Sequence, residues 1–92
     1  MNSFPEYDLE ELVKEIESDL NHELVIFNDD VNSFEHVIDT LIDVCEHEPE
    51  QAEQCTWIIH HKGKCSVKKG EVDSLNKMCR VILDRGISAS VN

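Results

Sequence analysis

The sequence changes character sharply at residues 28–32, and this change constrains how the first part of the fold can be built. Residues 23–27 form a mainly apolar run typical of a strand, and residues 28–32 are mostly amides and carboxylates. Behind Asn32 or Ser33, either of which can cap a helix, apolar residues recur at helical spacing. They are Phe34, Val37, Ile38, Leu41, Ile42 and Cys45. A strand end, an acceptor-rich turn and a helix start therefore meet at one edge of the fold.

The rest of the chain continues this alternation. Pro49 suits the first position of a second helix, which Gly63 ends, and a strand is predicted over 64–68. A third helix over 71–85 and a last strand over 87–91 complete the order β-α-α-β-α-β. Such a chain is predicted to fold as an α+β two-layer sandwich, in which three helices pack against a three-stranded antiparallel sheet.

Residues 1–21 are predicted to form an acidic N-terminal extension, and residues 22–92 the folded core. Apolar residues of the extension fall at helical spacing, which allows an amphipathic helix. They are Leu9, Leu12, Val13, Ile16 and Leu20. The alternative is a flexible tail, since residues 1–23 carry eight acids against Lys14 alone and these charges repel one another.

Charge is distributed unevenly along the 92 residues, whose net charge is -12. Residues 1–53 hold 17 acids and one base, whereas residues 54–92 hold 3 acids and 7 bases. This balance argues against nucleic acid as a partner, because phosphate binding needs clustered Lys and Arg. It is compatible with a partner protein that has a basic surface, or with a charge that serves solubility alone. The chain shows neither a membrane-length apolar stretch nor a secretory signal, so a cytoplasmic location is expected.

Four cysteines raise the question of disulfides or a metal site. They are Cys45, Cys55, Cys65 and Cys79, and three of them fall on apolar helical positions, which favours free thiols. A zinc site built on Cys55, His60 and Cys65 is the competing interpretation. No Cys-x-x-Cys pair is present and this spacing does not keep to one helical face, so no metal or cofactor is predicted.

The string Asn28-Asp29-Asp30 is the strongest candidate site. Its acceptors would suit a metal or a protonated amine, yet Asp and Asn are also common at helix starts, where they accept free N–H groups. An enzyme that uses Asp29, Asp30 and His60 as acid, base or metal ligands is a further possibility. The sequence offers it neither a nucleophile nor a metal spacing.

Several separated blocks, in order, carry a family resemblance. The string Asn28-Asp29-Asp30, the helix phrase Val37-Ile38-Asp39 and the segment 50–54 running into 60–64 resemble the ClpS family, the bacterial adaptor of the N-end rule. The resemblance covers about residues 22–91. It implies an adaptor, not an enzyme, that captures substrates beginning with Phe, Leu, Trp or Tyr. It also implies delivery to a Clp AAA+ unfoldase of the ClpA or ClpC type, by a monomer.

The resemblance also implies a set of site residues. Asn28 and Asp29 match the family's amine-binding residues, and His60 matches its rim histidine, while Asp30 is assigned to electrostatics at the rim. An α-amino group has a pKa of about 7.7–8.0, so near neutral pH it is mostly an ammonium with three donors. An amide oxygen, a carboxylate and a neutral imidazole supply three acceptors.

Apolar pocket walls and an unfoldase contact complete the residues implied by the resemblance. The walls are Phe34, Val37, Thr56, Ile59 and Ile87. Phe34 and Thr56 stand where many members carry Met, so Thr56 either opens one wall or leaves space that Phe34 refills. Glu71 and, less closely, Asn76 or Lys77 match unfoldase-contacting positions. The alternative function is an acidic interaction module that docks on a Clp or other partner without reading N-terminal residues.

Overall fold

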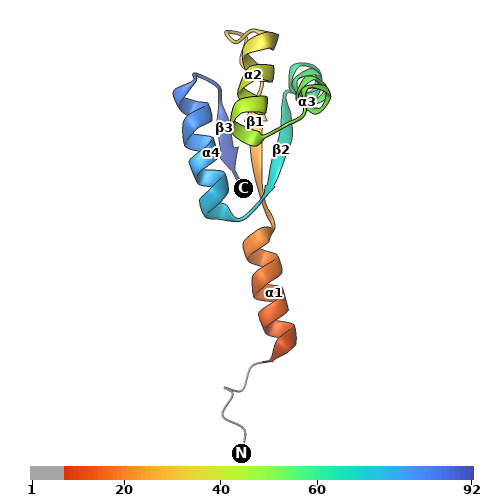
Figure 1. Cartoon of the computed structure of the whole chain (residues 1–92), viewed down its shortest axis with the longest axis vertical. Coiled ribbons are helices and arrows are strands. Elements are labelled where there is room, and N and C mark those ends of the chain that lie inside the picture. Colours follow the sequence, from red (N-terminus) through yellow and green to blue (C-terminus); the bar gives the residue numbers. More distant parts are fainter. Residues whose placement is uncertain (1–7) are drawn as a thin grey trace, which may run out of the picture.

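The computed structural model describes residues 8–92, in which helices and strands alternate as the sequence predicts from residue 22 onward (Figure 1). The first seven residues of the predicted N-terminal extension lie outside the described residues. The elements are α1 (Leu9–Leu20), β1 (His22–Phe27), α2 (Phe34–Cys45), α3 (Pro49–Lys62), β2 (Lys64–Gly70), α4 (Val72–Asp84) and β3 (Ala89–Val91).

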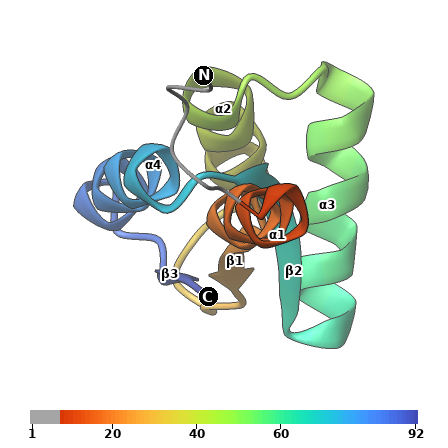
Figure 2. The same ribbon diagram turned by 90° about the horizontal axis from the view of Figure 1, so that it is seen from below.

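The three strands form one antiparallel sheet in the order β2-β1-β3, with β1 in the centre. Seen along the strands, α4 lies over β1 and β3, α3 runs beside β2, and α2 lies between these two helices (Figure 2). The predicted α+β class, the antiparallel sheet and the β-α-α-β-α-β order of the core are confirmed.

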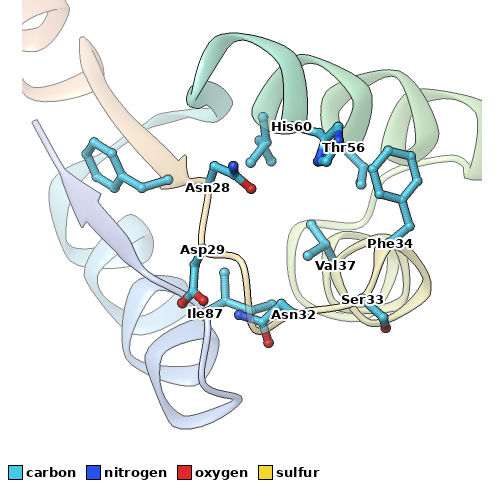
Figure 3. Close-up of a pocket in the computed structure, with 11 residues that line it drawn as sticks. Asn28, Asp29, Asn32, Ser33, Phe34, Val37, Thr56, His60 and Ile87 are labelled. Atoms are coloured by element: carbon cyan, nitrogen blue, oxygen red, sulfur yellow. The ribbon is translucent and has the colours of Figure 1, made fainter.

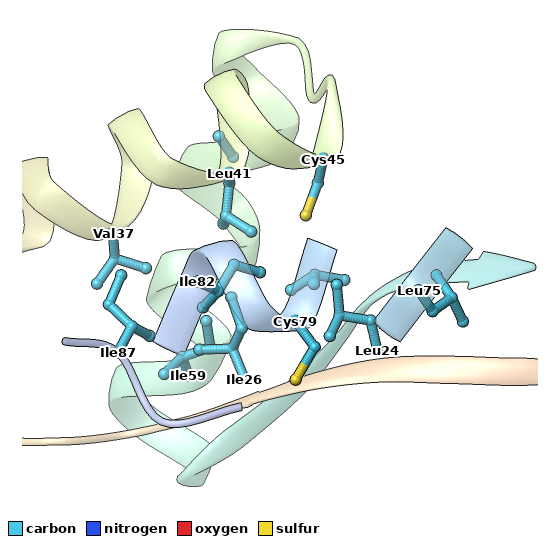
Figure 4. Close-up of a cluster of buried hydrophobic side chains, with 12 residues drawn as sticks. Leu24, Ile26, Val37, Leu41, Cys45, Ile59, Leu75, Cys79, Ile82 and Ile87 are labelled. Atoms are coloured by element: carbon cyan, nitrogen blue, oxygen red, sulfur yellow. The ribbon is translucent and has the colours of Figure 1, made fainter. Parts of the chain in front are cut away.

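The core forms where the inward faces of β1 and the helices meet. Leu24 and Ile26, two residues apart on β1, point to the same side of the sheet and are fully buried. They pack with apolar residues that recur at helical spacing on α2, α3 and α4, and Figure 4 shows the cluster. The largest fully buried side chains on the helices are Leu41, Leu75 and Ile82.

The boundaries of three predicted elements are corrected by the structure. β2 continues to Gly70 instead of ending at residue 68, because its last residues still pair with the start of β1. The predicted third helix begins at Val72, and Glu71 is its N-cap residue. β3 begins at Ala89 and not at residue 87, since Gly86 adopts a left-handed backbone (φ 82°) in the turn that leads to the strand.

Polar contacts fix this turn on α2. The Arg85 guanidinium donates to Thr40 Oγ1 (3.3 Å) and lies 3.2 Å from the Asp43 carboxylate. His36 Nε2 donates to the backbone carbonyl of Arg85 (2.8 Å). These contacts hold Arg85, the residue that directly follows α4, against α2. The chain after residue 85 therefore enters the core at a fixed position, where Ile87 is buried.

Helix α1 differs from the other helices because it buries none of its residues. It begins behind Asp8, whose carboxylate accepts from the Glu10 backbone N–H (2.9 Å), and it continues the line of β1 away from the other elements (Figure 1). The apolar residues that the sequence placed on one face, from Leu9 to Leu20, remain exposed. Among the described residues, no helix is long and apolar enough to cross a membrane.

All four cysteines are free thiols, and Cys45 and Cys79 are buried. Burial raises the pKa of the Cys45 thiol from its ordinary 9.0 to about 11, and the nearby Lys68 only partly offsets this. The pKa of Cys65 is also raised to about 11, by burial and then by the neighbouring Cys55. The folded protein therefore favours the neutral thiol at both positions.

These raised pKa values predict a loss of stability in alkali. A group whose pKa is higher in the folded state stabilises the fold fully below the unfolded pKa, and this contribution is lost as pH rises toward the folded pKa. We expect the free energy of unfolding to fall between about pH 9 and pH 11. Urea melts of the wild type and of Cys45→Ala across this range check the prediction. The variant should decline less steeply, and an equally steep decline contradicts the assignment to Cys45.

Candidate functional site

A pocket opens where β1 ends, between that strand end, the start of α2 and the second half of α3 (Figure 3). Its cavity volume is about 30 Å³. This is room for about two water molecules. The lining residues are Phe27, Asn28, Asp29, Asn32, Ser33, Phe34, Val37, Thr56, Ile59, His60 and Ile87. The structure thus brings together all the residues that the sequence assigned to amine binding and to the apolar walls.

Asn28 and Asp29 are held at the mouth by the backbone and by a turn. The Asn28 N–H donates to the carbonyl of Gly63 (2.8 Å), which ties the end of β1 to the end of α3. The Asp29 carboxylate accepts from the Val31 backbone N–H (3.1 Å) and from the Ser88 hydroxyl (3.4 Å). Both contacts orient the carboxylate, and each carboxylate oxygen retains acceptor capacity for a further donor.

Gly63 makes the hydrogen bond between the end of β1 and the end of α3 possible. It ends α3 with a left-handed backbone (φ 90°), and its N–H donates to the Ile59 carbonyl (2.9 Å). The chain then reverses directly into β2, which pairs with β1. His60, one turn before this reversal, is consequently brought to the same edge of the pocket as Asn28.

The His60 ring packs among other rings. Phe34 meets it edge to face at 5.4 Å between ring centroids, and His61 meets it at 5.3 Å. Trp57 contacts Phe34 edge to face (5.0 Å) and stacks on His61 (4.9 Å, 4° between planes). Ring packing therefore positions both His60 and Phe34 at the mouth.

The deeper walls are apolar and buried. Val37, Ile59 and Ile87 are each almost fully covered, and Figure 4 shows that they belong to the same cluster as the core. Thr56 is also buried, and its hydroxyl donates to the Ala52 carbonyl one turn earlier (2.8 Å). That donor is therefore satisfied within α3, and the hydroxyl does not leave an unpaired donor in the wall.

Asn32 has a role that sequence reasoning missed. Ser33, not Asn32, caps α2 by accepting from the His36 backbone N–H (3.1 Å). The Asn32 amide instead donates to the Gly86 carbonyl (2.9 Å). It thereby joins the loop after β1 to the turn that carries Ile87, a contact between residues far apart in sequence that no local pattern signals.

Three predicted residues lie outside the pocket lining. Asp30 is exposed on the loop beside it. Glu71 is at the start of α4, next to the His22 end of β1 and thus at the opposite end of that strand from the pocket, where its carboxylate accepts from the Ser74 hydroxyl (3.5 Å). Lys77 is exposed on α4. Within residues 8–92, no three His, Cys, Asp or Glu side chains are grouped so as to hold a metal ion.

Fold and pocket together define a small α+β domain with an apolar cavity and a few polar residues at its mouth, an arrangement typical of small-ligand sites. A family model described as ATP-dependent Clp protease adaptor protein ClpS matches residues 17–89. Because this match covers most of the chain, the chain belongs to the ClpS family of protease adaptors.

A solved structure supports the fold. Agrobacterium tumefaciens ClpS2 bound to L-phenylalaninamide is similar to this chain with a TM-score of 0.70 and 16% sequence identity, covering 80% of this chain and 96% of that one. At this identity the likeness concerns the fold alone. No curated protein sequence matches the chain.

Proposed function

We propose that this protein is an N-degron adaptor: it binds the free α-amino group and the large apolar first residue of a substrate, and delivers that substrate to a Clp AAA+ unfoldase and peptidase. The observation that carries the proposal is the mouth of the pocket, where Asn28, Asp29 and His60 surround an opening with apolar walls. The similar Agrobacterium protein is bound to a molecule with a free amino group and a phenylalanine side chain, which supports the same chemistry.

The three polar residues suit an ammonium group. An ammonium carries three donors, and an amide oxygen, a carboxylate and an imidazole nitrogen provide three acceptors. Asp29 adds a negative charge, which strengthens its hydrogen bond. Removing an ammonium from water without such partners costs several kcal/mol (about 2 or more), so a terminus that cannot donate in this way is rejected.

The apolar walls supply the second half of the recognition. Burying a Leu or Phe side chain contributes about 1.5–3 kcal/mol. The small cavity supports the alternative in which Phe34 takes up the space that the short Thr56 leaves. Phe34 must then move outward when a substrate side chain enters, and the preference remains for Phe, Leu, Trp and Tyr.

Delivery requires a second surface for the unfoldase. Glu71 and Lys77 on α4 are proposed to contact the N-terminal domain of a ClpA-type or ClpC-type unfoldase. Glu71 lies at the other end of β1 from the pocket. A monomer with this arrangement can hold the substrate terminus and the unfoldase at the same time.

Peptide affinity measured by fluorescence polarisation tests the proposal. A labelled peptide that begins with Phe should bind, and acetylation of its α-amino group should weaken binding by about tenfold or more, because the acetamide loses the charge and two donors. Otherwise identical peptides that begin with Leu, Trp, Tyr and Ile establish the preference. Equal binding of the free and acetylated forms would instead favour an acidic interaction module, for which the exposed apolar face of α1 is the available surface.

A further inference from the structure

An exposed aromatic surface continues from the pocket along α3. Trp57 is 48% exposed although it contacts Phe34 edge to face and stacks on His61. It does not line the pocket, whereas its neighbour Phe34 does. The stack on His61 of the same helix holds the Trp57 ring in place, so this exposed apolar surface loses little entropy when it binds a ligand.

The pocket geometry indicates what reaches this surface. With the α-amino group held at Asn28, Asp29 and His60 and the first side chain in the cavity, the carbonyl carbon on the tetrahedral Cα has to leave through the open mouth. Figure 3 shows Phe34 across the opening from Asn28 and Asp29. A substrate that leaves the mouth on the side away from Asn28 and Asp29 passes over Phe34, and Trp57 is the next ring beyond it.

We propose that Trp57, with the outer edge of Phe34, forms a subsite for the second side chain of the substrate and favours an apolar or aromatic residue there. The inference rests on the proposed function, because it assigns the peptide direction from the amine-binding residues. Continuity with the pocket through Phe34 selects this occupant for the Trp57 surface.

Ile58 provides a matched control on the same helix. Its side chain is 42% exposed, similar to that of Trp57. It borders a different hollow, formed with Val25 and Lys64 on the sheet. Substitution of Ile58 therefore removes exposed apolar surface from α3 without touching the proposed subsite.

The test compares two peptides that begin with Phe-Gly and Phe-Leu and are otherwise identical. In the wild type and in Ile58→Ala, the Phe-Leu peptide should bind about fivefold more tightly. In Trp57→Ala this preference should disappear, and in Trp57→Phe it should return in part. A loss of affinity in Trp57→Ala that is equal for both peptides would show that Trp57 only braces the other rings, and would overturn the subsite.

Fluorescence gives an independent readout, because Trp57 is the only tryptophan of the chain. Covering its ring by a second-residue leucine should shift its emission to shorter wavelength with Phe-Leu and much less with Phe-Gly. The same shift with both peptides overturns the subsite. If the amine-dependent binding of both peptides persists without a second-residue preference, this inference alone fails. If acetylation does not weaken binding of either peptide, the proposed function fails with it.

Discussion

Replacing Asp29 by Asn should lower the affinity for a Phe-initiated peptide by about tenfold or more. The substitution removes the charge that holds the ammonium but keeps an oxygen that can accept from the Val31 N–H, so the turn after β1 is preserved. Hydrogen bonds to charged groups contribute about 1.5–3 kcal/mol, which is more than neutral ones. The loss therefore reports on the contact with the ammonium and not on the fold.

Asp30→Asn is the matched control for this experiment. Asp30 follows Asp29 directly, is exposed and does not line the pocket, so its substitution changes the net charge equally without removing a mouth residue. Its effect on affinity should stay within about twofold, and salt should reduce it, because separated surface charges are screened. Competition fluorescence polarisation at low and high salt measures both variants. Equal losses of affinity in the two variants would mean that the peptide responds to the overall negative charge of the protein and makes no specific contact with Asp29.

Much of the fold follows from the sequence because its local signals agree. Pro49 begins α3 and Gly63 ends it, as their fixed and permissive backbones predict. The wrong boundaries of β2 and β3 depend on contacts between distant residues. β3 starts late because the turn at Gly86 is tied to α2 and to Asn32, and no local pattern contains those contacts.

The pocket lining was easier to predict from the sequence than the exposed rings beside it on α3. Most residues that line the pocket follow apolar periodicity or stand at the strand end, and the family resemblance singled out all of them except Phe27, Asn32 and Ser33. Trp57 and His61 were missed because hydrophobic periodicity identifies the buried face of α3, and both residues are exposed. Their spacing on one helix was the available signal, since Trp57 lies three residues before His60 and four before His61, and residues at these spacings share a face.

Truncation of Ile82 should cause the largest loss of stability. Ile82 is fully buried in the last turn of α4, where it packs in the cluster that includes Ile26 and Ile87 (Figure 4). Replacing a buried Ile by Ala costs about 2–5 kcal/mol, through lost burial and the cavity left behind. For a domain of this size each kcal/mol corresponds to about 4–8 °C, so Ile82→Ala should lower Tm by about 10 °C or more.

Leu83→Ala is the control, because it makes a similar change one residue further along the same helix at a side chain that is 51% exposed. It should change stability by no more than about 0.5 kcal/mol. Ile82 also bears on the site, because its side chain packs in the same buried cluster as Ile87, which forms part of the pocket wall. At a temperature where Ile82→Ala is still folded, Phe-initiated peptides should therefore bind it less tightly than they bind Leu83→Ala.

Equal melting temperatures of the two variants, measured by circular dichroism, would contradict the core position of Ile82. Unequal melting with equal affinity would show that the pocket wall is held by Asn32 and Arg85 without help from the core beneath it.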